Sequence, residues 1–151
     1  MTEPGGRRHS PRRWDRLRGF FSRGAAKDAL TLVDDDRLVV VAESADEAVA
    51  SSVVLDPSPW RSGEPAVLRH FLVFGGGRAE EAVRVAGFNG YQVITGAAGP
   101  PGTETAEDTV AFAKLEAFDA VDVSRERSRI ASMASRHRGT VLGWQVLQLP
   151  E

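Results

Sequence analysis

The sequence predicts a small α+β domain, and three observations lead to this fold class. The segment 66–74 (AVLRHFLVF) is an apolar run rich in β-branched and aromatic residues, which is typical of a strand. The segment 123–138 carries apolar residues at helical spacing, which predicts a helix. A further apolar run, 140–149, follows Gly139 and predicts a closing strand. With 151 residues, the chain is long enough to bury a core without disulfides.

The residues before this core predict a short β-α unit and then a loop. Leu38 to Val41 form a short apolar run, which predicts a strand. The residues Ser44-Ala-Asp-Glu47 match a capping box, which predicts a helix over about 45–53. The segment 56–65 (DPSPWRSGEP) is rich in Pro, so we expect a loop, with Trp60 lying over the core.

The middle of the chain predicts a strand, a helix and a second strand. Three glycines, 75–77, follow the strand 66–74 and favour a turn. The segment 78–88 (RAEEAVRVAGF) predicts a helix, with Glu80 and Glu81 in the first turn, where the helix dipole favours anions. Asn89-Gly90 ends it, and 91–95 (YQVIT) predicts the second strand.

The segment 104–119 permits two interpretations. Its Ala, Lys, Leu and Glu content favours a helix, whereas Val110 and Phe112, two positions apart, suit a strand over 108–116. If 108–116 is a strand, the body from residue 66 has the order β-α-β-β-α-β. That order is the ferredoxin-like arrangement, an antiparallel four-stranded sheet with two helices on one face. The β-α piece of 36–55 would then extend the edge of the sheet.

The helix 123–138 is expected to begin at a polar cap and to bury one stripe. Asp122 or Ser124 is the expected cap. Val123, Ile130 and Met133 share the apolar stripe, which leaves the arginines of this helix facing outward. These arginines are interpreted as a solvated surface, with contact to RNA phosphates as the alternative. They are Arg125, Arg127, Arg129, Arg136 and Arg138.

The charge divides the chain into an arm and a body. The net charge of the whole chain is -2, but residues 1–27 carry eight basic and two acidic side chains. We therefore expect a basic arm over 1–30 and one α+β domain over 31–151, with its core in 66–149. The acidic body excludes a nucleic-acid binder that is basic throughout. The absence of Cys excludes zinc–thiolate sites, iron–sulfur clusters and thiol nucleophiles.

The arm combines arginines with one aromatic side of a helix. Trp14, Leu17, Phe20 and Phe21 have the spacing of a single helix face. This pattern predicts contact with RNA or an anionic membrane through residues 7–23, or docking into a partner groove. Packing of the aromatic residues onto the body and a disordered tail are the alternatives. The candidate binding residues are Arg7, Arg8, Arg12, Arg13, Trp14, Arg16 and Arg18.

We do not expect the arm to be an export signal. Arg23, Lys27 and Asp28 interrupt the apolar run that an export signal requires after its basic start. The chain also contains no run of 18 apolar residues, which a spanning helix requires. We therefore expect a cytoplasmic protein.

No catalytic motif stands out. The glycine run 75–77 is followed by Arg78-Ala79 instead of the Lys-Ser/Thr of a P-loop, and Glu80 occupies the position where a dinucleotide motif needs Gly. His70 lies on an apolar strand, and no orienting carboxylate or nucleophile can be assigned to it, so we expect a core histidine. The sequence therefore predicts a protein that is not an enzyme and needs no cofactor or metal.

Four groups of residues, in order, resemble the RraB family of ribonuclease E inhibitors. A strand with a His-aromatic pair is similar to Arg69-His70-Phe71, and a Gly-Tyr-x-Val strand start is similar to Gly90-Tyr91-Gln92-Val93. A helical Ile-x-x-Met/Leu-Ala pattern is similar to 130–134, and a closing Gly with Gly-Trp is similar to Gly139 and Gly143-Trp144. The match covers about 66–148. It departs at Val141-Leu142, where the family has Tyr-Asp, and in the basic arm.

The resemblance implies a strand at 108–116, a ferredoxin-like fold and a regulatory module that is not an enzyme. The implied partner is an RNA-processing enzyme, and His70 and Trp144 are the candidate binding residues of the body. Two other functions remain open. One is a nucleic-acid or anionic-membrane binder that acts through the arm. The other is an ACT-like small-molecule sensor, in which the turns at 75–77 and Gly90 line an effector site between two chains.

Overall fold

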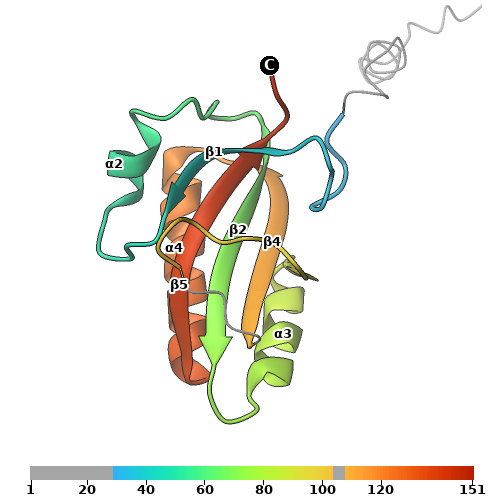
Figure 1. Cartoon of the computed structure of the whole chain (residues 1–151), viewed down its shortest axis with the longest axis vertical. Coiled ribbons are helices and arrows are strands. Elements are labelled where there is room, and N and C mark those ends of the chain that lie inside the picture. The colour runs from blue at the N-terminus through green and yellow to red at the C-terminus, as the bar shows by residue number, and fades with distance from the viewer. Residues whose placement is uncertain (1–28, 104–107) are drawn as a thin grey trace, which may run out of the picture.

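The computed structural model describes residues 29–103 and 108–151. These residues form a five-stranded antiparallel sheet with three helices, so the α+β prediction is confirmed (Figure 1). The strands are β1 (Val39–Ser44), β2 (Pro65–Phe74), β3 (Gln92–Ile94), β4 (Thr109–Ala117) and β5 (Gly139–Gln148). The helices are α2 (Ser51–Leu55), α3 (Ala79–Phe88) and α4 (Ala120–Arg136).

The sheet has the order β1-β5-β2-β4-β3, and the long strand β2 lies at its centre. β2 pairs with β4 on one side and with β5 on the other, and the ladder with β5 shifts register between Phe71 and Leu72. β1 lies at the edge beside β5, as predicted for the added β-α piece. The prediction of a strand over 108–116 is confirmed by β4, whereas residues 104–107 lie outside the described residues.

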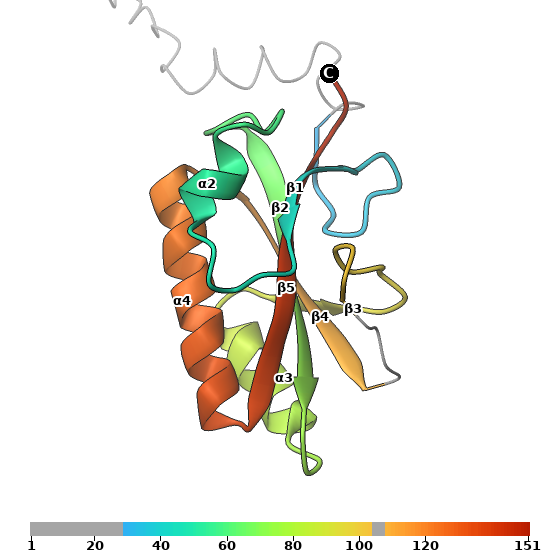
Figure 2. The same ribbon diagram turned by 60° about the vertical axis from the view of Figure 1, so that its left-hand side comes forward.

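The two faces of the sheet are covered in different ways. Residues of β2 alternate between them, so Leu68, His70 and Leu72 point toward the helices, while Arg69 and Phe71 point to the other side. We call these the helix face and the loop face. The helix face is covered by all three helices, and the loop face by the segment 29–38 and the loop 95–103 (Figures 1 and 2).

Helix α4 begins earlier than the sequence predicts. Its first helical residue is Ala120, and the cap is Asp119 instead of Asp122 or Ser124. The Asp119 carboxylate accepts a hydrogen bond from the Asp122 backbone N–H, and the Asp122 carboxylate accepts one from the Asp119 N–H. This reciprocal capping box satisfies two free donors of the first turn, which is why the helix begins here.

The predicted helix over 45–53 is wrong in its position. The Ser44 hydroxyl and the Asp46 carboxylate accept hydrogen bonds from the backbone of their own turn, at Asp46 and Ala48. Short polar side chains of this kind stabilise a turn in competition with a helix. The helix α2 therefore forms only from Ser51, where Leu55 can bury itself in the core.

Candidate functional site

A cluster of four polar side chains is buried between the sheet and α4. His70 from β2 and Tyr91, which precedes β3, lie under Glu126 of α4, and Lys114 of β4 completes the cluster. The Tyr91 hydroxyl donates a hydrogen bond of 2.6 Å to Glu126 Oε2, and His70 Nε2 lies 3.4 Å from the same hydroxyl. Lys114 Nζ donates to Glu126 Oε1 at 3.3 Å and lies over the Tyr91 ring. We call these four residues the buried polar cluster.

Burial sets the protonation states of His70 and Tyr91. His70 is 1% exposed, and this burial, together with the positive charge of Arg127, lowers the pKa of its imidazole to about 3. Burial and the hydrogen bond to Glu126 raise the pKa of Tyr91 far above its usual range. At neutral pH the cluster thus holds a neutral imidazole and a protonated phenol, which stays a donor to the carboxylate of Glu126.

The buried polar cluster reaches the surface mainly through Arg129. Arg129 Nη1 lies 3.1 Å from Glu126 Oε1, and its side chain is about half exposed. Arg129 also lines a groove of about 350 Å³ between α3 and α4. The other lining residues are Val85, Asn89, Ser128, Ser132, Met133 and Arg136. The cluster itself is closed, so the groove is the part of this region that is open to a partner.

An exposed aromatic residue lies beside this groove. Phe88 is 85% exposed, and it follows Glu81 and Val85 on one stripe of α3 at helical spacing. Glu81 pairs with His137 at the end of α4, and Val85 lines the groove, so this stripe faces toward α4. A single exposed apolar side chain is common on protein surfaces, but an aromatic one beside a groove that also holds two arginines makes this region a candidate contact surface. We call Phe88 with the lining residues the α3–α4 groove.

The structure places the predicted site residues in two groups. His70 and Trp144 are both in the core, where their side chains pack and offer no surface to a partner. Arg127 lies over the Trp144 ring at 4.9 Å from its centroid. The predicted binding residues of the arm lie outside the described residues. They are Arg7, Arg8, Arg12, Arg13, Trp14, Arg16 and Arg18.

Arg127 does not lie in the solvated surface that the sequence predicts for the arginines of α4. Its guanidinium donates to the carbonyl oxygens of Glu47 and Val49 and to the Ser51 hydroxyl, so it fastens the segment before α2 to α4. The prediction is wrong for Arg127 because a long side chain on the flank of a helix can reach a neighbouring loop.

Glu126, the central residue of the buried polar cluster, was not predicted from the sequence. A signal was present, since Glu126 lies three positions after Val123 and four before Ile130, on the stripe that the helix buries. An acidic residue on a buried stripe needs partners, and Tyr91 and Lys114 supply them.

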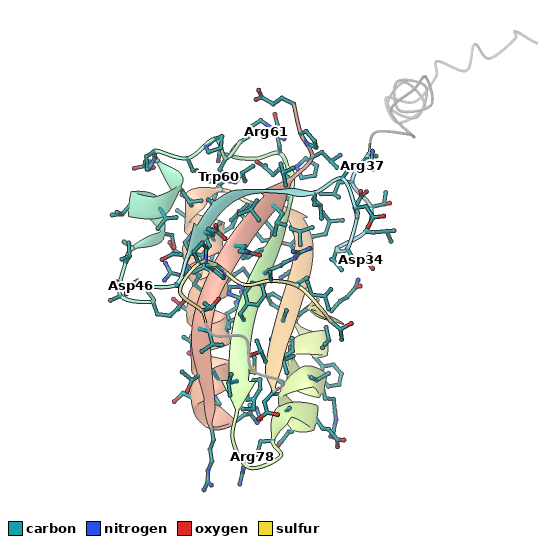
Figure 3. The ribbon with its side chains drawn as sticks, in the orientation of Figure 1. Asp34, Arg37, Asp46, Trp60, Arg61 and Arg78 are labelled. Carbon is teal, nitrogen blue, oxygen red and sulfur yellow. The ribbon has the colours of Figure 1, made fainter. Side chains whose placement is uncertain are left out.

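The described residues show neither a metal site nor a membrane-spanning helix. Within residues 29–103 and 108–151, no three His, Asp or Glu side chains come together in a way that could hold a metal ion. Arg78 lies in the turn that follows β2, at the opposite end of the molecule from Arg61 (Figure 3). In the same described parts of the chain, no helix has both the length and the apolar character needed to cross a bilayer.

Comparisons with family models, with curated proteins and with solved structures found no match to this chain. The resemblance to the RraB family therefore stays a prediction.

Proposed function

We propose that this chain is a regulatory module, without catalytic activity of its own, that binds an RNA-processing enzyme through the α3–α4 groove. The observation that carries the proposal is the exposure of Phe88 beside a groove that holds Arg129 and Arg136. Exposed aromatic and arginine side chains are enriched at the centres of protein interfaces. The partner segment would therefore combine apolar side chains with Asp or Glu.

The buried residues support this choice of surface. The residues that carry the resemblance, among them His70, Tyr91 and Trp144, lie in the core. Their order therefore bears on the fold, and contact with a partner would come from other residues. The hydrogen bonds of the buried polar cluster hold α4 against the sheet, which positions Arg129 at the mouth of the groove.

We further propose that β2 to β5 with α3 and α4 form a ferredoxin-like unit in a cytoplasmic protein. Three features support the fold: the element order β2-α3-β3-β4-α4-β5, the neighbours β5-β2-β4-β3, and both helices on one face.

The test is inhibition of RNA cleavage by a purified ribonuclease E-type endoribonuclease. The full chain is expected to bind the enzyme and slow cleavage, and Phe88→Ser and Arg136→Glu are each expected to weaken binding at least tenfold, since central interface residues contribute about 2 kcal/mol or more. Val53→Ser and Arg78→Glu are the matched controls, because both side chains are exposed and lie away from the groove.

Three outcomes would contradict the proposal. The first is a full chain that neither binds the enzyme nor changes the cleavage rate. The second is equal loss in the groove variants and in their controls. The third is binding that disappears when residues 1–27 are deleted or the salt concentration is raised, which would assign the activity to the basic arm.

A further inference from the structure

A cationic side chain lies on the loop face with none of its hydrogen bonds made. Arg69 is at the centre of β2, between the fully buried Val67 and Phe71. Its Nε atom is buried without a partner, and its guanidinium makes no hydrogen bond or ion pair with any residue of the described ranges. The burial of Nε is costly, because this atom has lost its water and no protein atom replaces it, while the side chain as a whole is only half-buried.

A second unsatisfied atom lies directly beside it. Gln145 of β5 is the register partner of Arg69 and is 2% exposed. Its Nε2 donates to Glu43 Oε2 at 2.9 Å and to the Ala98 carbonyl oxygen at 3.2 Å, which fixes the orientation of the amide. Its Oε1 is buried without a partner. The Cβ atoms of residues paired on neighbouring strands are about 5 Å apart, so an unpartnered donor and an unpartnered acceptor come from adjacent side chains of the same face.

These two residues lie at the boundary between the two segments that cover the loop face. The segment 29–38 packs through Val33 on Val67 and Leu147. The loop 95–103 approaches Phe71 at Gly99 and holds Gln145 through Ala98. In Figure 1 the loop crosses the middle of the sheet and the segment lies beside it, and Figure 2 shows both on the side away from the helices. Arg69 is only partly covered, so a small molecule has access to it from solvent.

We infer that Arg69 and Gln145 form a binding site for a small carboxylate that carries a hydroxyl or amino group next to the carboxylate. The planar guanidinium offers parallel N–H groups, which match the two oxygens of a carboxylate. The Oε1 of Gln145 has no donor and is closed to solvent in the unliganded chain, so the neighbouring hydroxyl or amino group supplies that donor once the covering side chains move aside. α-Hydroxy acids and α-amino acids have this combination. The site is on the opposite face from the α3–α4 groove and does not depend on it.

The charges around Arg69 favour a singly charged ligand over phosphate. Asp34, labelled in Figure 3, raises the pKa of Arg69 by Coulombic attraction and opposes the lowering by burial, but it makes no direct ion pair. Glu43 lies behind Gln145 as its acceptor. Two carboxylates this near the site repel a second negative charge. A ligand with one carboxylate and its own donor avoids that repulsion.

The test is an NMR titration of the ¹⁵N-labelled full chain that follows the Nε–H signal of Arg69 and the Gln145 amide. Glycolate and glycine are expected to shift both signals to saturation. Acetate, which lacks the donor, is expected to bind at least tenfold more weakly, and sodium chloride at equal ionic strength is expected to leave the signals in place. Arg69→Met is expected to abolish the shift of the Gln145 amide, whereas Arg125→Met, on exposed α4, is expected to keep it.

Each other outcome would overturn a stated part of the inference. No saturable shift with glycolate or glycine, or an unchanged shift in Arg69→Met, removes the site. Equal binding of acetate removes the role of Gln145, and tighter binding of inorganic phosphate removes the assignment to carboxylates. Should Arg69→Met fail to fold, Arg69→Lys keeps the charge without the planar fork and is expected to bind at least tenfold more weakly.

Discussion

The helix face and the loop face of the sheet both bury charged groups, but the central charged group of each face differs in how many partners it has. On the helix face, Glu126 accepts hydrogen bonds from Tyr91, Lys114 and Arg129. On the loop face, Arg69 makes none with the described residues, and one oxygen of Gln145 has no partner. The two regions are on opposite sides of the same central strand, because His70 and Arg69 are consecutive residues of β2.

From this difference we infer that the helix face mainly stabilises the fold and that the loop face mainly binds a ligand. A buried carboxylate with three donors holds the elements that supply them, here α4, β4 and the residue before β3. An arginine without partners contributes little to the folded state and leaves its donors free for a ligand. Proteins commonly retain such unsatisfied groups where function requires them. We therefore expect substitutions on the helix face to change folding, and those at Arg69 to change binding.

The largest expected effect is at the centre of the buried polar cluster. Glu126→Leu leaves Lys114 with only the exposed Glu116 as its ion-pair partner and leaves the Tyr91 hydroxyl without its acceptor. Breaking a buried ion pair in this way is expected to lower the free energy of unfolding by about 3–5 kcal/mol, measured by urea denaturation. Glu80→Gln, on the exposed side of α3, is the control, with an expected change below about 0.5 kcal/mol. Similar losses in the two variants would contradict the role of the cluster.

The second prediction concerns pH and His70. In the unfolded chain this histidine takes up a proton near pH 6.5, but in the folded chain only near pH 3. The unfolded state therefore binds more protons between these values, and stability is lost as the pH falls through this window, by up to about 1.4 kcal/mol per unit. Denaturation at pH 7, 6 and 5 is expected to show a smaller loss for His70→Leu than for the unchanged chain. Equal slopes for the two proteins would refute this.

The third prediction concerns how the loop 95–103 is held on the loop face. A Cβ at Gly143 would lie 2.7 Å from the Ser44 carbonyl oxygen and 3.0 Å from Pro100 Cγ. Gly143→Ala is therefore expected to cost about 1–3 kcal/mol and to speed hydrogen exchange in this loop. Gly87→Ala, where a Cβ meets nothing within 4 Å, is the control and is expected to stabilise α3. Unchanged exchange in the loop of Gly143→Ala would show that this contact does not hold it.

Local patterns were sufficient to predict most of the elements. The strand 66–74 and the helix 78–88 are specified by apolar runs and by the glycines between them, and they agree with β2 and α3 to within one residue. Elements whose ends depend on side-chain competition were harder. The side chains of Ser44 and Asp46 stabilise a turn, and Asp119 begins α4 three residues earlier than predicted.

The candidate sites depend on contacts that the sequence pattern does not contain. Arg69 and Gln145 become neighbours only through the register of β2 with β5. The burial of Glu126 depends on which flank of α4 meets Tyr91 and Lys114. Periodicity places a residue on a face, but it does not state which polar atoms across the interface remain unpaired. Such atoms occur on both faces, since Trp144 Nε1 and Arg127 Nε on the helix face also have no partner. The faces differ in that Arg127 makes three other hydrogen bonds, whereas the half-buried Arg69 makes none with the described residues.

The smallest expected effect is at Asp34, whose substitution tests the charges around Arg69 on the loop face. Asp34 is exposed and attracts Arg69 without a direct contact, so solvent and salt screen the interaction. Asp34→Asn is expected to change the free energy of unfolding by less than about 0.5 kcal/mol, far less than Glu126→Leu. Because the substitution also removes a negative charge that opposes an anion, glycolate is expected to bind more tightly, by a factor that shrinks as salt is added. Weaker binding in Asp34→Asn would show that Asp34 belongs to the site as a ligand contact, and that the loop face is organised around more than Arg69 and Gln145.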